Sequence, residues 1–194
     1  MEYLTVGTNN ITYEQFKEIE DTKTDIMKPN GGIWLTEYNP LYKNYNLWVD
    51  FILDNPNLLF YKNRSSNIWQ QPCSIVTLKS DTNIFNLDDY DSWKYLHDKF
   101  PLNSQKFSYE KMTKIYDGIY VDVTKLFKRN LDDNLFKFIR QYGVSSLLLF
   151  NLDCIDYYQS GSVNIEPFDF EYQAYDVISY EISYDDIKKR ILKK

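Results

Sequence analysis

The chain has 194 residues, a length typical of one domain. Its 43% hydrophobic and 18% aromatic residues can supply a core of that size. The net charge of −6 disfavours a general affinity for DNA or RNA, because such binding depends on neutralising phosphates with lysine and arginine. Two cysteines and one histidine are too few for a disulfide framework or a structural zinc site.

The N-terminal residues 1–8 carry neither the basic nor the apolar part of a signal peptide. No apolar run approaches the roughly 18 residues of a membrane span. We therefore expect a cytoplasmic protein without a membrane partner, in the cell that makes it or, if its gene is mobile, in a host cell.

The N-terminal third of the chain alternates strand and helix patterns. A strand is expected over residues 2–6, before Gly7, and a helix over residues 12–20, because Thr12 and Gln15 form a capping-box pattern. Residues 28–32 (KPNGG) are the strongest turn signal in the chain, and a strand over residues 33–36 follows them.

The central part continues this alternation. Pro40 allows a helix to begin, and its apolar face at helical spacing comprises Leu41, Tyr45, Trp48, Val49 and Ile52. Strand patterns follow at residues 58–61 and 73–78, and a helical pattern covers residues 88–100. Ser108 can cap a helix that continues to Tyr116.

The last third predicts two buried strands and several helices. A strand is expected over residues 118–123, one or two helices over 124–142 with Gly143 as the C-terminal cap, and a central apolar strand over 145–151. Residues 170–182 form a further strand or bent pair of strands, and Ser183 caps a terminal helix. The irregular order of elements favours one α+β domain over residues 1–194.

Common catalytic motifs are absent: the sequence has no phosphate loop, no Gly-x-Ser-x-Gly and no His-Glu-x-x-His. The carboxylate pairs Asp88-Asp89 and Asp132-Asp133 stand at predicted helix starts, where negative charge is favoured, and we interpret them as caps. His97 lies inside a predicted helix and is interpreted as structural or exposed. No metal site is predicted.

Several segments remain as candidates for a ligand site. They are residues 4–8 (LTVGT), 32–36 (GIWLT) before an aromatic-rich helix, 116–119 (YDGI), and 145–151 (SSLLLFN) with Ile155 beyond. In this order, from residue 3 to 156, they resemble the ADP-ribosyltransferase superfamily. Its poly-ADP-ribosyl polymerase branch has a strand ending in His-Gly-Ser or His-Gly-Thr and a second strand close to Gly-Ile-Tyr-Phe-Ser. Residues 28–34 (KPNGGIW) and Trp48 also resemble phage and mobile-element proteins.

The resemblance implies a split, mainly antiparallel sheet flanked by helices, and NAD as the substrate. Trp34 would stack on the nicotinamide ring, and the backbone of Gly7 and Thr8 would hold its amide. The implied cofactor-binding residues are Gly7, Thr8, Gly32, Trp34, Thr36 and Trp48. The family also uses a glutamate that steadies the positive charge developing on the ribose.

Two positions depart from the family pattern. Val6 stands where the histidine is expected, and Ser146 stands at the position of the glutamate. Glu171, in EYQAYD, is the best substitute, and if its strand is the true third segment the glutamate is present. The two alignments stay open, so the candidate catalytic residues are Glu171 and Ser146.

Three functions are compatible with these residues. The first is a mono-ADP-ribosyltransferase, a toxin or phage-conflict effector, that transfers ADP-ribose to a protein or nucleic-acid acceptor. The second is an inactive module of the same fold that binds a nucleotide or a protein partner. The third is an unrelated α+β domain whose aromatic residues make a protein interface. For the single residues, core packing of Trp34 and Trp48 and simple turns at the glycines also stay open as alternatives.

Overall fold

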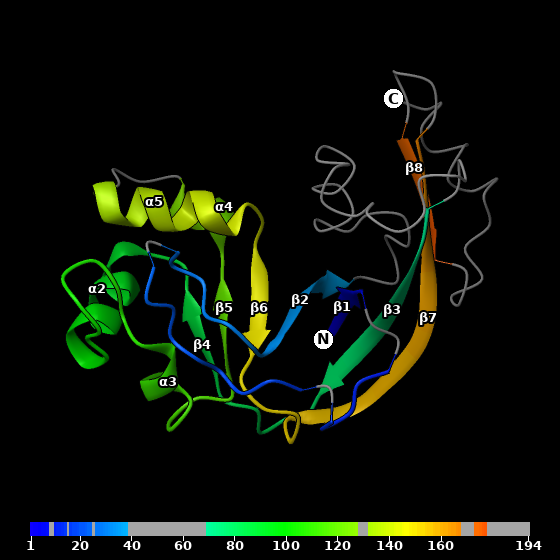
Figure 1. The fold of residues 1–194 in the computed structure, drawn as a ribbon, viewed down its shortest axis with the longest axis horizontal. Helices are drawn as coiled ribbons and strands as arrows, with labels where there is room; N and C mark the ends of the chain where they lie inside the picture. Colours follow the sequence, from blue (N-terminus) through cyan, green and yellow to red (C-terminus); the bar gives the residue numbers. More distant parts are fainter. Residues whose placement is uncertain are drawn as a thin grey trace. The chain divides into compact units, whose positions relative to one another are not determined.

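The computed structural model describes residues 1–7, 10–14, 16–24, 26–38, 69–127, 132–167 and 173–177. The chain forms two compact units. Unit 1 consists of Met1–Ile11, Thr36–Leu78 and Asp156–Lys194, and unit 2 of Thr12–Leu35 and Lys79–Ile155. All four helices of the described residues belong to unit 2 (Figure 1). The predicted α+β class with mixed, mainly antiparallel strands is confirmed.

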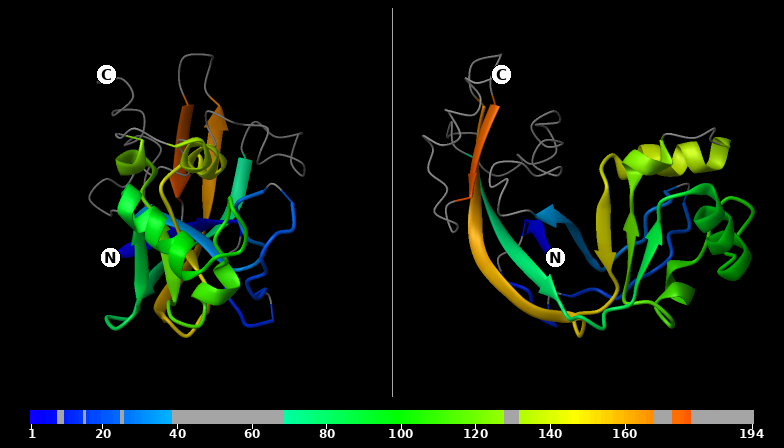
Figure 2. Two further views of the ribbon diagram at one scale, coloured as in Figure 1. Left: turned by 90° about the vertical axis from the view of Figure 1, so that its left-hand side faces the viewer. Right: turned by 180° about the vertical axis from the view of Figure 1, so that it is seen from behind.

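Unit 1 is built from strands wherever the structure describes it. β1 (Glu2–Val6) lies between the second half of β2 (Ile33–Tyr38) and β3 (Trp69–Leu78), and it is antiparallel to both. The order continues through β7 (Ile155–Pro167) to β8 (Gln173–Val177). β7 bends strongly along its length (Figure 2). The middle three residues of β1 are all buried, as expected for a strand with neighbours on both sides.

Unit 2 has its own strand order, β4-β5-β6 and then the first half of β2. β4 (Ile84–Leu87) runs parallel to β5 (Gly118–Val121), while β5 is antiparallel to β6 (Ser146–Leu149). Every residue of β6 is buried, which confirms the prediction of a central strand without alternation.

The helices of unit 2 begin where the sequence offers a cap. They are α2 (Tyr90–Lys99), α3 (Tyr109–Met112), α4 (Val123–Leu126) and α5 (Asp133–Tyr142). Their N-caps are Asp89, Ser108, Asp122 and Asp132, each accepting a hydrogen bond from a backbone N–H three residues on. Gly143 ends α5 as predicted. α3 stops at Met112, so the predicted continuation to Tyr116 is wrong.

The core of unit 2 is rich in aromatic rings. The ring of Phe138, on α5, lies 4.8 Å from that of Trp93 on α2 and 4.5 Å from that of Tyr142. These rings cover Ile119 of β5 and Leu148 of β6, and Trp34 packs against the same cluster with part of its surface exposed. Burying each such side chain contributes about 1.5–3 kcal/mol, so this cluster is the main support of the unit.

The helix predicted over residues 12–20 is wrong. Phe16 N–H donates to Thr12 O, a single turn, and the chain then has no regular secondary structure until Glu20 pairs with Asn30 through two backbone hydrogen bonds. Gly32 N–H also donates to Lys17 O at 2.9 Å. These long-range backbone bonds compete with a helix that has only a capping pattern to support it.

Some strands of the structure were not predicted from the sequence, and some predicted elements lie outside the described residues. β4 and β7 were not predicted, and neither was the start of β3. The helix predicted after Pro40, the strand 58–61 and the helix after Ser183 lie outside the described residues, and β8 is the described part of the segment 170–182. None of the described helices combines the length and apolar character needed to cross a bilayer.

Both cysteines are buried and free. Burial raises the pKa of the Cys73 thiol to about 12. Burial, followed by the charge of Asp117, raises the pKa of the Cys154 thiol to about 11. Both thiols are therefore protonated at neutral pH.

Candidate functional site

Trp34 is the sequence-predicted ligand residue with the most informative surroundings. It stands on β2 directly opposite Leu148 of β6, and its ring meets that of Tyr142 edge to face at a centroid distance of 5.4 Å. The indole is half-buried rather than enclosed, so part of it can contact a ligand. It packs on the core as the sequence alternative proposed, and it keeps the exposure that a stacking role requires.

A lysine ammonium lies over this indole. Lys28 Nζ is 4.9 Å from the centroid of the Trp34 ring and 5.0 Å from that of Tyr142, which are cation–π distances. Nζ also donates a long hydrogen bond of 3.5 Å to the carbonyl oxygen of Tyr142, at the C-terminal end of α5. A cation there is favoured by the helix dipole.

Lys28 is half-buried, and within the described part of the chain it makes no salt bridge; the salt bridges found there belong to Lys125. Burial lowers the pKa of Lys28 from its usual value. The residue is held in place by its neighbour, because Met27 N–H donates to Gln141 Oε1 at 2.6 Å. The result is a fixed positive charge beside a partly exposed indole.

A buried pair of tyrosines supports the arrangement of Lys28 and Trp34. The hydroxyl oxygens of Tyr142 and Tyr109 are 2.7 Å apart, and both side chains are buried. Burial raises the pKa of each phenol far above the neutral range. Tyr109 is in turn fixed by its backbone N–H, which donates to Asp21 Oδ1 at 2.7 Å. Both phenols therefore stay neutral and act as rigid support.

Gly7 and Val6 belong to unit 1, at the end of β1. Gly7 has a φ of +104°, a conformation that favours glycine, and its N–H donates to Pro72 O at 2.7 Å. That N–H is therefore already occupied. Val6 pairs with Cys73 on β3 and offers no polar group. Trp34 lies in unit 2, so a slot between Gly7 and Trp34 stays a prediction.

Gly32, directly before β2, and Thr36, on β2, have structural roles. A Cβ on Gly32 would lie 2.6 Å from Leu148 Cδ1 and from Leu149 O, and its φ is +69°. Glycine is required there because β2 and β6 approach closely. Thr36 is buried in unit 1, opposite Leu4 of β1. Their predicted contact with a cofactor is untested.

Of the two candidate catalytic residues, the structure describes only Ser146. Ser146 is buried on β6, opposite Val121, on the same face of the strand as Leu148. As a neutral hydroxyl it cannot balance a ribose cation. Glu171, Thr8 and Trp48 lie outside the described residues.

Comparison with known proteins gives no family. No protein-family model, no curated protein and no solved structure matches the chain. The site is therefore interpreted from its own geometry.

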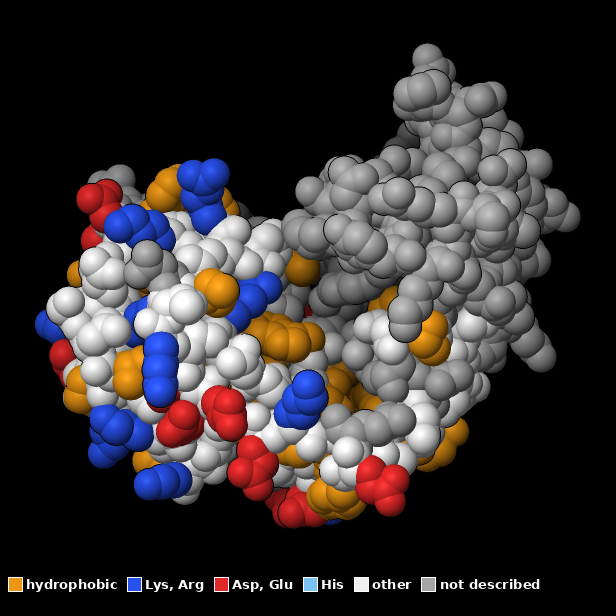
Figure 3. Space-filling view, viewed as in Figure 1, with side chains coloured by type: hydrophobic (Ala, Val, Ile, Leu, Met, Phe, Trp, Pro, Cys, Tyr) orange, Lys and Arg blue, Asp and Glu red, His pale blue; other side chains and the backbone are white. Residues whose placement is uncertain are grey.

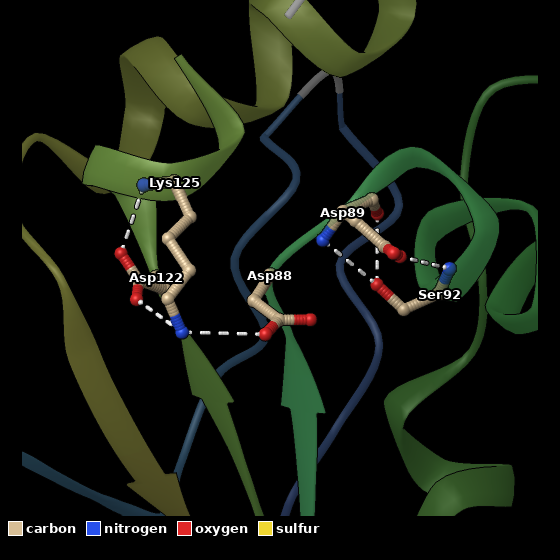
Figure 4. A network of polar contacts seen from close by, with 5 residues as sticks. All are labelled: Asp88, Asp89, Ser92, Asp122 and Lys125. Atoms are coloured by element: carbon tan, nitrogen blue, oxygen red, sulfur yellow. Dashed lines mark hydrogen bonds and ion pairs between the residues drawn. The ribbon is translucent and has the colours of Figure 1, made fainter. Parts of the chain in front are cut away.

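A second charged group stands where the parallel strands end. Asp88 follows β4 and Asp122 follows β5, and Lys125 Nζ lies 3.3 Å from Asp88 Oδ2 and 3.2 Å from Asp122 Oδ2 (Figure 4). Beside them Asp89 and Ser92 form a reciprocal capping box at the start of α2. This confirms Asp89 as a helix cap, whereas Asp88 forms an ion pair with Lys125 instead. No cluster of three or more metal-ligating side chains occurs among the residues in these described ranges.

Charge is mixed on one face of the described surface. On the face drawn in Figure 3, lysine and arginine side chains alternate with acidic and apolar ones. The described residues on this face therefore form no broad basic patch for a nucleic acid.

Sequence reasoning missed Lys28, Tyr142 and Tyr109. Lys28 was taken as part of the turn 28–32, and Tyr142 as the last residue of a helix. Only the packing of this turn against the end of α5 brings Lys28 over Trp34, and no spacing in the sequence signals that contact.

Proposed function

We propose that the protein is a binding module that takes a nucleotide of the NAD type on the exposed part of Trp34 and does not transfer ADP-ribose. The observation that supports this most directly is the ammonium of Lys28, 4.9 Å from the centre of the indole and without a described carboxylate partner. An indole supplies a flat surface for a ring, and the ammonium supplies attraction for an anion.

The same ammonium disfavours the stacking that a transferase needs. The nicotinamide ring of NAD carries a positive charge, and like charges repel most strongly where water is partly excluded. A cation already lies over the Trp34 ring, so the adenine or phosphate part of the nucleotide is better suited to this place than the nicotinamide. The N–H of Gly7 already donates to Pro72 O, so it is less able to bind the nicotinamide amide as the resemblance implies.

Ser146 supports binding without turnover. Cleavage of the bond between nicotinamide and ribose develops positive charge on the sugar, and an enzyme stabilises it with a fixed anion. Ser146 is neutral and buried, and it presents no such charge.

Calorimetry on the full chain tests the proposal. NAD and ADP-ribose are expected to bind with similar affinity, nicotinamide alone is expected not to bind, and no nicotinamide is released on incubation with NAD. Trp34→Ala should weaken binding about tenfold or more, since stacking of a base on an aromatic ring contributes about 1–3 kcal/mol. Phe127→Ala is the matched control, because Phe127 is an exposed aromatic of the same unit. Absence of binding by both NAD and ADP-ribose would overturn the proposal.

A mono-ADP-ribosyltransferase is the second candidate, and one observation favours it. β1 pairs with β2, and β2 pairs with β6, so three segments of the family resemblance stand on successively paired strands. In this case Glu171 would supply the anion, and a protein or nucleic acid would accept the ADP-ribose. Transfer of label from NAD to proteins or nucleic acids of a lysate, lost in Glu171→Gln, is the expected result. Release of nicotinamide in the calorimetric sample would likewise favour this candidate.

A further inference from the structure

We infer that Lys28 is the receptor for the phosphate groups of the ligand, and that pyrophosphate chemistry, rather than the base or the nicotinamide, defines what binds. This deepens the proposed function and rests on it for the identity of the nucleotide. The site consists of the Lys28 ammonium, the rings of Trp34 and Tyr142, and the Tyr142 carbonyl.

Among the described residues, the hydrogen bonds of Lys28 leave capacity for an anion. An ammonium has three donors. One of them makes the 3.5 Å contact to the Tyr142 carbonyl, a length at the limit of a hydrogen bond, and the ring faces give non-directional attraction. A phosphate oxygen would make a shorter, charge-assisted bond than any of these.

The burial of Lys28 adds to this preference. Within the described ranges no acidic side chain forms a salt bridge with it, so its charge is partly desolvated without compensation from an anion. An anionic ligand supplies that compensation. Because burial lowers the pKa of Lys28, anion binding should raise it again, so binding should take up protons where the free Lys28 ammonium has begun to lose its proton.

The site is also pre-organised. Met27 is tied to Gln141, Tyr142 is tied to Tyr109, and the Trp34 ring is held against Tyr142. A ligand that enters such a site does not have to order the side chains that bind it, which favours affinity.

The test is calorimetry of the full chain with pyrophosphate, ADP and inorganic phosphate as separate ligands. Pyrophosphate and ADP are expected to bind, and inorganic phosphate more weakly because it carries less charge. Lys28→Gln should weaken pyrophosphate binding at least tenfold, while Lys28→Arg should retain it within a few fold. Lys125→Gln is the matched control and should leave it unchanged, because Lys125 is held by two aspartates.

A second measurement uses the unaltered chain, in case Lys28→Gln fails to fold. Pyrophosphate should slow the reductive methylation of Lys28, read by mass spectrometry, and should not slow that of Lys125. Equal protection of both lysines, or of neither, would overturn the inference, as would normal pyrophosphate binding by folded Lys28→Gln.

The outcomes separate this inference from the proposed function. If NAD and ADP-ribose bind while pyrophosphate does not, the phosphate receptor is wrong and the nucleotide module stands. If pyrophosphate binds at Lys28 while NAD and ADP-ribose do not, the receptor stands and the nucleotide module is wrong. If phosphate and pyrophosphate bind equally, the ligand is a single phosphate group and the preference for pyrophosphate is overturned.

Discussion

Two lysines of unit 2 stand in opposite surroundings. Lys125 is 60% exposed and lies between two aspartates, whereas Lys28 is half-buried between two aromatic rings. Hydrogen bonds to Asp122 and then to Asp88 raise the pKa of Lys125, while burial lowers the pKa of Lys28.

The contrast shows which of the two lysines is suited to bind something else. The charge of Lys125 is already satisfied within the fold, and its exposed ion pairs contribute little because solvent screens them. The charge of Lys28 is fixed by packing and left without an anion in the described residues. The lysine at the strand ends in Figure 4 is already paired with two aspartates, whereas the ammonium at the end of α5 has no anionic partner among the described residues.

The largest expected effect follows from removing the Tyr142 ring, over which Lys28 lies. Tyr142→Ala deletes a buried ring that contacts Trp34 and Phe138, and the free energy of unfolding should fall by about 3–5 kcal/mol. Denaturant titration measures it. Phe136→Ala on the exposed side of the same helix should change it by less than about 1 kcal/mol. Similar losses in both variants would mean that Tyr142 is not the support we describe.

A smaller effect on stability is expected when only the hydrogen bond between Tyr142 and Tyr109 is removed. Tyr142→Phe leaves the Tyr109 hydroxyl buried without its partner, which should lower the free energy of unfolding by about 1–3 kcal/mol. Replacing both tyrosines with phenylalanine should recover most of that loss, since no unpaired hydroxyl remains. A double variant as unstable as the single one would contradict this account.

His97 is a third basic group of unit 2, and its surroundings also shift its pKa. Burial lowers its pKa, opposed by the charges of Asp132 and Asp98, and its Nε2 is buried without a hydrogen-bond partner in the described residues. The unfolded chain therefore binds more protons just below about pH 6.5, so stability should fall as the pH falls through that range. His97→Phe should flatten this part of the stability profile. Superimposable profiles for the two proteins would show that His97 contributes nothing.

The smallest effect is expected at Lys125. Lys125→Gln should leave the midpoint of thermal unfolding unchanged within experimental error, at low and at high salt, because exposed pairs are screened. A clear drop at low salt would indicate that the strand-end network stabilises unit 2, and would weaken the contrast with Lys28.

Local signals in the sequence were reliable where a single residue decides the geometry. Asp89, Ser108 and Asp132 cap helices as predicted, because a cap depends on atoms within three residues. The same signal failed at Thr12, where long-range backbone pairing of Glu20 with Asn30 takes the place of a helix. A capping pattern therefore needs an amphipathic face behind it before it predicts a helix.

Long-range features were beyond the sequence. β7 was missed because its first half, from Asp156 to Ser162, carries polar and tyrosine side chains and shows no alternation of apolar and polar residues. Trp34 was predicted from the sequence as a ligand residue, and that prediction stays open. The position of Lys28 over its ring comes from packing of the turn before β2 against Tyr142 of α5, which is distant in the sequence. The fold class could thus be predicted from composition and order, and the charge beside the indole could not.

The two buried thiols make the chain convenient for spectroscopy. With pKa values of about 12 and about 11, Cys73 and Cys154 should be nearly inert to maleimide and iodoacetamide reagents at neutral pH. A cysteine introduced at an exposed position such as Thr124 would then take a fluorophore or spin label selectively. Distances from such a probe to Trp34 could follow ligand entry without first removing the native cysteines.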